Sequence, residues 1–274
     1  MSTLATEISQ SPFDAVAESY DQGFTFSKIG QAQRSAVWRE LGRTFHAGDR
    51  VLDIGCGTAV DACFLAERGV KVLACDSSPA MIQVAARRVR EMGTDNTVDL
   101  RLLAAENLAE VQQQAQFDGV FSNFGALNCV EDLKAVGEDL GRLLKPGGTA
   151  LLCFLGPSCV WEVIWYLLKA KPRKAFRRWH SSSITAQLAP ESHLQIRYYG
   201  IRSLERIFAP SLRVRSWRGV GLLVPPSYVE LFAKRFPALL KLAEWADLLL
   251  TRCPVIRGGS DHILVKLERV AQWQ

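Results

Sequence analysis

The sequence predicts one α/β domain built on a doubly wound, mostly parallel seven-stranded sheet. Short apolar segments alternate with helix-length amphipathic segments through the first 155 residues, and the first apolar segment ends in a Gly-Cys-Gly turn. The length of 274 residues suits one large domain with insertions and is short for two separate domains. Because strand–helix–strand crossovers are right-handed, this alternation gives a sheet covered by helices on both faces.

The first half of the chain repeats a strand–turn–helix unit. Val37, Leu41 and Phe45 recur at helical spacing, and the turn at Gly48-Asp49 separates this helix from the first strand. In the second unit Ser78 is predicted to cap a helix whose first residue is Pro79. The expected segments are a helix over 34–45, a strand over 51–54, a helix over 60–68, a strand over 70–75 and a helix over 79–91.

The second half begins with the same alternation of strands and helices, which ends near Gly156. Strands are predicted over 100–103, 119–122 and 149–155, with a helix over 132–144 that ends at the sequence KPGG. Beyond Gly156 we expect a helix over 160–168, an irregular polar segment over 181–200, a helix over 202–208, a strand over 212–217, an apolar helical stretch from Pro225 to Leu250 and a final edge-paired strand over 262–267. Segments 157–200 and 219–258 are expected to form a cap over the carboxyl ends of the strands, within a single domain of residues 1–274.

Composition excludes several classes of function. The seven cysteines include no C-x-x-C pair and no metal-ligand spacing with the four histidines, so we expect reduced thiols, no metal and a cytoplasmic protein. No window offers about 20 uninterrupted apolar residues, and residues 1–12 are expected to be a loose polar arm rather than a signal or anchor. The net charge of +5 is too modest to indicate a nucleic-acid partner.

The residues most informative about chemistry lie around the first two predicted strands. Gly55 and Gly57 allow a sharp turn and a close approach of ligand to backbone, and Asp76, at the end of the next strand, is placed to accept hydrogen bonds from ribose hydroxyls. Val60 stands where a dinucleotide fingerprint needs a glycine, so pyrophosphate ligands are disfavoured. Asp53 adds negative charge that suits a cationic or amino-bearing ligand. The alternative is a tight turn without a ligand.

With these features the sequence resembles the class I S-adenosylmethionine-dependent methyltransferases. The resemblance covers about residues 13–155 and resumes in the last strands. It rests on six segments: FDAVAESYD at 13–21, VLDIGCGT at 51–58, ACDSSPAM at 74–81, LAAENL at 103–108, FDGVFSNF at 117–124 and LKPGG at 144–148. It implies S-adenosylmethionine as methyl donor and S-adenosylhomocysteine as product.

The resemblance also implies roles for individual residues. It assigns the methionine part of the cofactor to backbone contacts with Gly55, Cys56 and Gly57, and both ribose hydroxyls to Asp76. It further places Ser77 and Met81 beside the adenine, Ala105 and Glu106 at the adenine edge, Asn123 near the methionine and sulfonium, and Tyr20 and Arg34 at the methionine carboxylate.

Two positions depart from the family pattern. Ala104 stands where many relatives have an aspartate that contacts the adenine amine. We therefore expect Glu106 or Asn107 to recognise the adenine amine instead. Ala59 stands where many have a third glycine, and it is small enough that we expect the turn to survive.

The acceptor is predicted less directly. Aromatic and aliphatic residues of the cap favour a small, apolar or lipid-like molecule, and an oxygen or carbon acceptor would need a base. His193 and Tyr199 are the candidates for base or acceptor contact, although a surface histidine beside core tyrosines is the commoner arrangement. The basic segment Lys169–Arg178 could touch a membrane surface, or could simply be a solvated helix. An NAD-dependent oxidoreductase and a non-catalytic cofactor-binding scaffold remain alternatives, and the acceptor atom and oligomeric state stay open.

Overall fold

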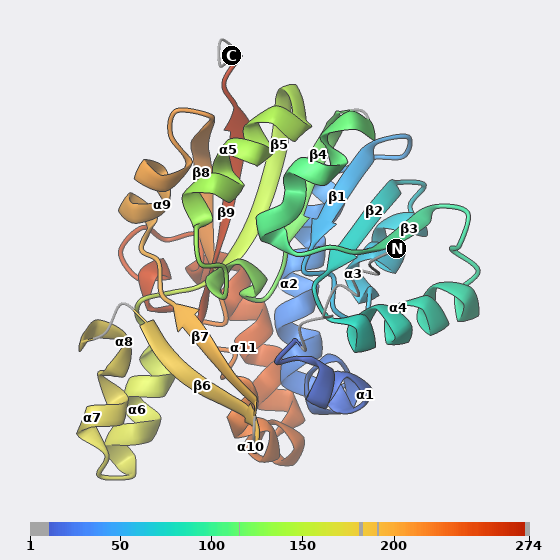
Figure 1. Cartoon of the computed structure of the whole chain (residues 1–274). Helices are drawn as coiled ribbons and strands as arrows, with labels where there is room; N and C mark the ends of the chain where they lie inside the picture. Colours follow the sequence, from blue (N-terminus) through green and yellow to red (C-terminus); the bar gives the residue numbers. More distant parts are fainter. Residues whose placement is uncertain (1–10, 115, 181–182, 191, 272–274) are drawn as a thin grey trace, which may run out of the picture.

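The main sheet has seven strands and matches the predicted fold class. The computed structural model describes residues 11–114, 116–180, 183–190 and 192–271, so most of the predicted N-terminal arm lies outside the described residues. The strand order is β3-β2-β1-β4-β5-β9-β8, with β9 antiparallel to both of its neighbours and the other described pairs parallel (Figure 1). The strands are β1 (Arg50–Ile54), β2 (Lys71–Asp76), β3 (Val98–Leu102), β4 (Phe117–Ser122), β5 (Leu144–Leu155), β8 (Leu212–Val220) and β9 (His262–Arg269).

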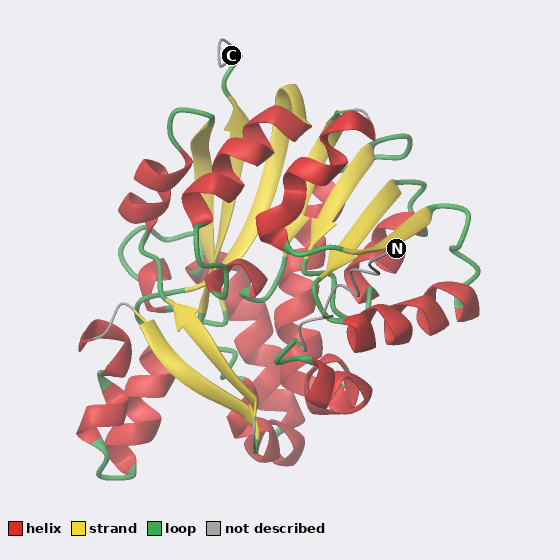
Figure 2. Cartoon of the chain, viewed as in Figure 1, coloured by secondary structure: helices red, strands yellow, loops and turns green. Residues whose placement is uncertain are grey.

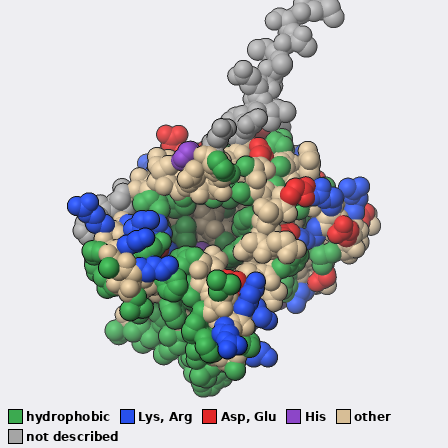
Figure 3. Space-filling view, turned by 90° about the horizontal axis from the view of Figure 1, so that it is seen from below, with side chains coloured by type: hydrophobic (Ala, Val, Ile, Leu, Met, Phe, Trp, Pro, Cys, Tyr) green, Lys and Arg blue, Asp and Glu red, His purple; other side chains and the backbone are tan. Residues whose placement is uncertain are grey.

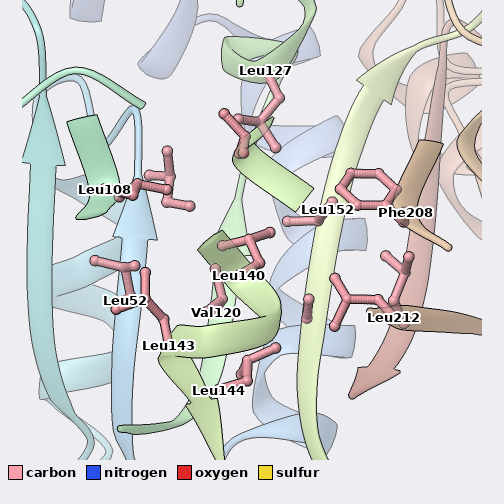
Figure 4. Close-up of a cluster of buried hydrophobic side chains, with 14 of the residues drawn as sticks. Leu52, Leu108, Val120, Leu127, Leu140, Leu143, Leu144, Leu152, Phe208 and Leu212 are labelled. Carbon is pink, nitrogen blue, oxygen red and sulfur yellow. The ribbon is translucent and has the colours of Figure 1, made fainter. Parts of the chain in front are cut away.

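Helices cover both faces of this sheet (Figure 2). On one face α5 (Leu133–Leu143), α9 (Ile201–Phe208) and the 3₁₀ segment Ala105–Gln114 pack over β1, β4 and β5, and Figure 4 shows Leu140, Leu152 and Phe208 within this cluster. On the other face α2 (Lys28–Thr44), α3 (Val60–Ala66) and α4 (Pro79–Glu91) bury a second cluster. The near-continuous apolar strands of the sequence follow from this double coverage.

Local signals in the sequence determine where the helix that follows β2 begins. Ser78 caps α4 as predicted, because its Oγ accepts a hydrogen bond from the backbone N–H of Met81 at 3.1 Å. Pro79 occupies the first turn, where its missing N–H has no consequence. The cap holds the first turn of α4 against the carboxyl end of β2.

Three predicted segments differ from the structure. The segment expected to be irregular contains a hairpin of β6 (Ser183–Ala189) and β7 (Ser192–Arg197), which forms a separate two-stranded sheet. The final strand, β9, lies between β5 and β8, so β8 is the edge strand. The helical stretch after Pro225 divides into α10 (Glu230–Arg235) and α11 (Pro237–Leu250), because Pro237 disfavours helical geometry at Phe236, whose φ and ψ are −126° and 63°.

The segments predicted as a cap lie at the carboxyl ends of the parallel strands (Figure 1). They comprise α6 (Val160–Leu168), α7 (Pro172–Ala175), α8 (Arg177–His180), the β6–β7 hairpin, α10 and α11. The second predicted segment begins within β8, since β8 extends to Val220. Across the described ranges, no helix combines the length and apolar character needed to span a bilayer.

Candidate cofactor and acceptor site

The turn after β1 brings three backbone positions to the carboxyl edge of the sheet. Gly55 has φ +70°, and a Cβ there would lie 2.3 Å from the Cβ of Ala126, so packing as well as backbone geometry requires glycine. At Gly57, with φ +53°, a Cβ would meet nothing within 4 Å, which leaves open space beside the backbone. Ala59 holds the left-handed conformation, with φ +58°, so the turn forms without the third glycine.

Asp76 lies at the end of β2 and is held by this turn. Its Oδ2 accepts a hydrogen bond from Gly57 N at 2.9 Å, and its Oδ1 accepts one from Ser78 N at 2.9 Å. Burial raises the pKa of Asp76, while the hydrogen bonds from Ser78 and Gly57 lower it. The two backbone donors fix the carboxylate where it lines the main cavity.

A buried polar cluster lies beside the turn. Asp61, in the first turn of α3, forms an ion pair with Arg34 at 2.6 Å and accepts hydrogen bonds from Trp38 Nε1 at 2.6 Å and Asn123 Nδ2 at 2.8 Å. The Arg34 guanidinium also lies 4.9 Å from the centroid of the Phe124 ring, and its Nε has no hydrogen-bond partner. Asp61 therefore fixes both Arg34 and Asn123 from within the protein.

Asp53 on β1 is almost fully buried, with 1% of its surface exposed, and its Oδ2 has no partner. Burial, with the nearby charges of Asp61 and Asp76, raises the pKa of this carboxyl well above its ordinary value of 3.8, and Arg34 opposes this shift. A buried carboxyl that lacks a cation is an unsatisfied partner for an ammonium group.

Replacing Asp53 with asparagine should therefore stabilise the ligand-free protein at high pH. Between the unfolded pKa and the higher folded pKa, the unfolded chain has released a proton that the folded chain retains, so the free energy of unfolding falls as pH rises. Urea titrations at about pH 4 and about pH 8 should show a smaller fall for Asp53→Asn than for the natural protein. Asp95→Asn, at an exposed carboxylate, is the matched control. Equal pH dependence of Asp53→Asn and the natural protein would contradict the assignment.

The main cavity, of about 340 Å³, opens at the carboxyl edge of the sheet. Figure 3 looks onto this face and shows the molecule hollowed at its centre. The cavity is lined by nine of the predicted cofactor residues, which are Tyr20, Gly55, Gly57, Asp76, Ser77, Met81, Ala105, Glu106 and Asn123. Arg34 and Cys56 line a smaller pocket of about 30 Å³, which shares Tyr20, Gly55 and Gly57 with the main cavity. Asp53 lines neither space in the described structure.

The remaining wall of the cavity is mostly apolar. Leu127, Val130 and Leu155 come from the core domain, and Leu188, Leu194 and Ile196 come from the β6–β7 hairpin. The hairpin contacts the N-terminal segment, because Ser192 Oγ donates a hydrogen bond to the carbonyl of Pro12 at 2.6 Å. It thus encloses a space beside the cofactor residues.

The structure separates both predicted acceptor residues from this cavity. Side chains of a strand alternate between its two faces, and on β7 Leu194 and Ile196 face the cavity while His193 is exposed in a separate surface depression. Tyr199 packs edge-on against Phe154, with ring centroids 5.9 Å apart, and does not line the cavity. Neither residue is placed to act as a base in this conformation.

The N-terminal segment covers the turn through side-chain contacts. Asp14 Oδ1 accepts hydrogen bonds from Ser78 Oγ at 2.5 Å and Ala80 N at 3.2 Å. Asp21 accepts one from Thr58 Oγ1 at 2.8 Å and pairs with Arg88 at 2.5 Å. These contacts place Tyr20 over the cavity.

Sequence reasoning missed Asp61, Phe124 and the apolar residues of the hairpin. Asp61 carried a detectable signal, since it is an acidic residue within the apolar sequence VDACFLA of α3. Phe124, with φ +46°, carried no comparable signal, because its strained backbone follows from the turn after β4.

Comparisons with known proteins identify the family of this chain. A family described as "Methyltransferase domain" matches residues 51–148. Demethylmenaquinone methyltransferase from Clavibacter sepedonicus is 36% identical over 143 residues, 52% of this chain and 55% of that protein. The enzyme of the same name from Mycolicibacterium paratuberculosis is 35% identical over 173 residues, 60% of this chain and 69% of that protein. The match thus spans about half the length of the first relative and about two thirds of the second.

The fold agrees with a solved structure over nearly the whole chain. The CcbJ methyltransferase from Streptomyces caelestis superposes with a TM-score of 0.62 at 16% identity, covering 96% of this chain and 99% of that one. This likeness extends through the cap segments as well as the sheet.

Proposed function

Because this chain belongs to the class I S-adenosylmethionine-dependent methyltransferases, we propose that it methylates a small apolar acceptor of the quinol type. The observation that carries the proposal is the apolar wall contributed by Leu188, Leu194 and Ile196, which adjoins the cofactor residues in one cavity. The names of the relatives support the acceptor class, since both are demethylmenaquinone methyltransferases.

The residues at the polar end suit the cofactor's charges. The Arg34 guanidinium favours the methionine carboxylate. Asp53, which lies behind the turn and lines neither cavity in the described part of the chain, favours the methionine ammonium through its charge rather than by contact. Asp76 is placed for the ribose hydroxyls, with Met81 and Glu106 further along the same cavity for adenine. A dinucleotide would bring its pyrophosphate to the turn after β1, close to Asp53, so this arrangement disfavours the NAD-dependent alternative.

The cofactor supplies a methyl group already bonded to a good leaving group. The protein's own contribution is therefore to align the acceptor and to exclude water, which the hairpin and the N-terminal segment favour by covering the cavity. No histidine occurs among the described residues that line it. Purified protein that binds S-adenosylmethionine but methylates no quinol would support the scaffold alternative.

A charge on the apolar wall should weaken acceptor use selectively. Ile196→Asp is expected to lower kcat/KM for a short-chain quinol by about tenfold or more, because a carboxylate replaces apolar contact with the acceptor. Gln195→Asp is the matched control, since its exposed side chain lies on the other face of β7. Calorimetry with S-adenosylhomocysteine should give similar dissociation constants for both variants. Equal kcat/KM in the two variants would contradict the assignment of the hairpin to the acceptor.

The cap and its basic segment belong to the same proposal. We propose that segments 157–200 and 219–258 enclose the acceptor. We also propose that the basic segment Lys169–Arg178 contacts a membrane, but through only some of its cations. Arg177 and Arg178 pair with the buried Glu162 at 2.6 and 2.8 Å, and Arg178 also pairs with Asp261 at 2.8 Å. The exposed cations of this segment, which an anionic surface could contact, are Lys169, Lys171, Arg173 and Lys174.

A further inference from the structure

Helix α11 has the reverse of the pattern expected for a helix at a water-facing surface. Asp247 is buried, and its carboxylate accepts hydrogen bonds from the backbone N–H groups of Leu222, Leu223 and Val224 at 3.1, 2.7 and 3.1 Å. The outward face instead carries a stripe of large apolar side chains at helical spacing. These are Leu239, Leu242, Trp245 and Leu249, which are 50%, 59%, 63% and 62% exposed.

The stripe continues into a larger apolar surface. Helix α10 adds Leu231, 84% exposed, and Phe232, and α6 adds Leu168, 80% exposed. Between Trp161 of α6 and helices α10 and α11 lies a groove of about 470 Å³, lined almost entirely by apolar side chains such as Phe236 and Leu242. Figure 3 shows hydrophobic side chains gathered beside the central hollow, on the same face of the molecule. Contiguous apolar surface of this extent marks an interaction site.

The charges around this surface have one sign. Within 157–179 and 226–256, each exposed charged side chain is a lysine or an arginine, namely Lys169, Lys171, Arg173, Lys174, Lys234, Arg235, Lys241 and Arg252. The acidic residues of these segments are turned inward or engaged. Glu162 and Asp247 are buried, Glu230 accepts hydrogen bonds from Lys28 N and Ile29 N, and Glu244 is half-buried.

We propose that α10, α11 and the end of α6 rest on an anionic lipid bilayer, with the apolar stripe in the headgroup region and the basic side chains against lipid phosphates. Apolar side chains flanked by lysine and arginine are the pattern of interfacial helices. A symmetric dimer through this face would bring the basic rims together, which disfavours a second copy as the occupant. Membrane binding itself does not depend on the proposed function. Only its purpose rests on the proposed function, and that purpose is to give the cavity access to an acceptor dissolved in the bilayer.

Sedimentation of the full chain with vesicles tests the surface without cofactor or acceptor. We expect binding to phosphatidylcholine vesicles containing roughly one third phosphatidylglycerol, at least tenfold weaker binding to phosphatidylcholine alone, and loss of binding between about 0.1 M and about 0.5 M salt. Leu242→Glu/Trp245→Glu and Lys234→Glu/Lys241→Glu should each weaken binding about tenfold or more. Met92→Glu and Lys71→Glu are the matched controls, because both residues are exposed on other elements.

Circular dichroism and S-adenosylhomocysteine affinity should be unchanged in all four variants, which separates a surface effect from misfolding. Absence of binding to the anionic vesicles, or equal binding by Leu242→Glu/Trp245→Glu and Met92→Glu, would overturn the proposal. So would a dimer of the natural chain in ultracentrifugation that the same double variant abolishes. Failure of the proposed function would appear separately, as lack of methyl transfer to a detergent-dispersed quinol by a chain that still binds vesicles.

Discussion

Asp61→Ala is expected to lower the free energy of unfolding by about 3–5 kcal/mol. The substitution leaves the buried Arg34 guanidinium without its carboxylate, and it removes the acceptor of the hydrogen bonds from Trp38 and Asn123. Burial lowers the pKa of Arg34, whereas Asp61, together with Tyr20 and Asp21, raises it, and the net result lies above the ordinary value. Urea denaturation with a constant m-value would measure the loss.

Glu268→Ala provides the control for Asp61→Ala. Glu268 pairs with Arg215 at 2.7 Å at a solvent-exposed position, so its removal should change the urea midpoint little. The double variant Arg34→Met/Asp61→Leu should recover part of the lost stability, because it leaves no single buried charge. A midpoint for Asp61→Ala equal to that of Glu268→Ala would show that the buried pair does not stabilise the fold.

The sheet and the polar end of the cofactor site could be predicted because their signals are local. Gly55, Gly57 and Asp76 occur within two consecutive strand ends, and parallel strands bring their carboxyl ends to one edge whatever the rest of the chain does. The same holds for Ser78 and Pro79, whose roles in α4 depend only on neighbouring backbone. Predicting the roles of these residues therefore required no knowledge of long-range packing.

The residues that were missed or misplaced depend on contacts between distant segments. Asp61 acts through Arg34 and Asn123, which lie on α2 and after β4. His193 was chosen for its chemistry, but the register of the hairpin points it away from the cavity and points Leu194 and Ile196 in. The sequence predicted an apolar helical stretch over α11 but not which face it buries. Asp247 takes the inward face because its carboxylate accepts hydrogen bonds from three backbone N–H groups of residues 222–224.

Asp76→Ala is expected to weaken S-adenosylmethionine binding by about 2 kcal/mol, roughly 30-fold in dissociation constant. Each ribose hydroxyl would lose a charged acceptor that Gly57 N and Ser78 N hold in place. Asp99→Ala removes an exposed carboxylate from the adjacent strand, where it pairs only with Arg101 among the described residues, and should leave calorimetric affinity unchanged.

A cofactor analogue separates lost ribose contacts from a loosened turn. Asp76→Ala also frees the backbone N–H groups of Gly57 and Ser78, so a weaker dissociation constant alone has two explanations. The 2′-deoxy analogue of S-adenosylhomocysteine lacks one of the two hydroxyls. It should bind the natural protein several-fold more weakly than the parent compound, and it should bind Asp76→Ala about as well as the parent does, because the partner of the missing hydroxyl is already gone. An equal penalty in both proteins would place the ribose away from Asp76.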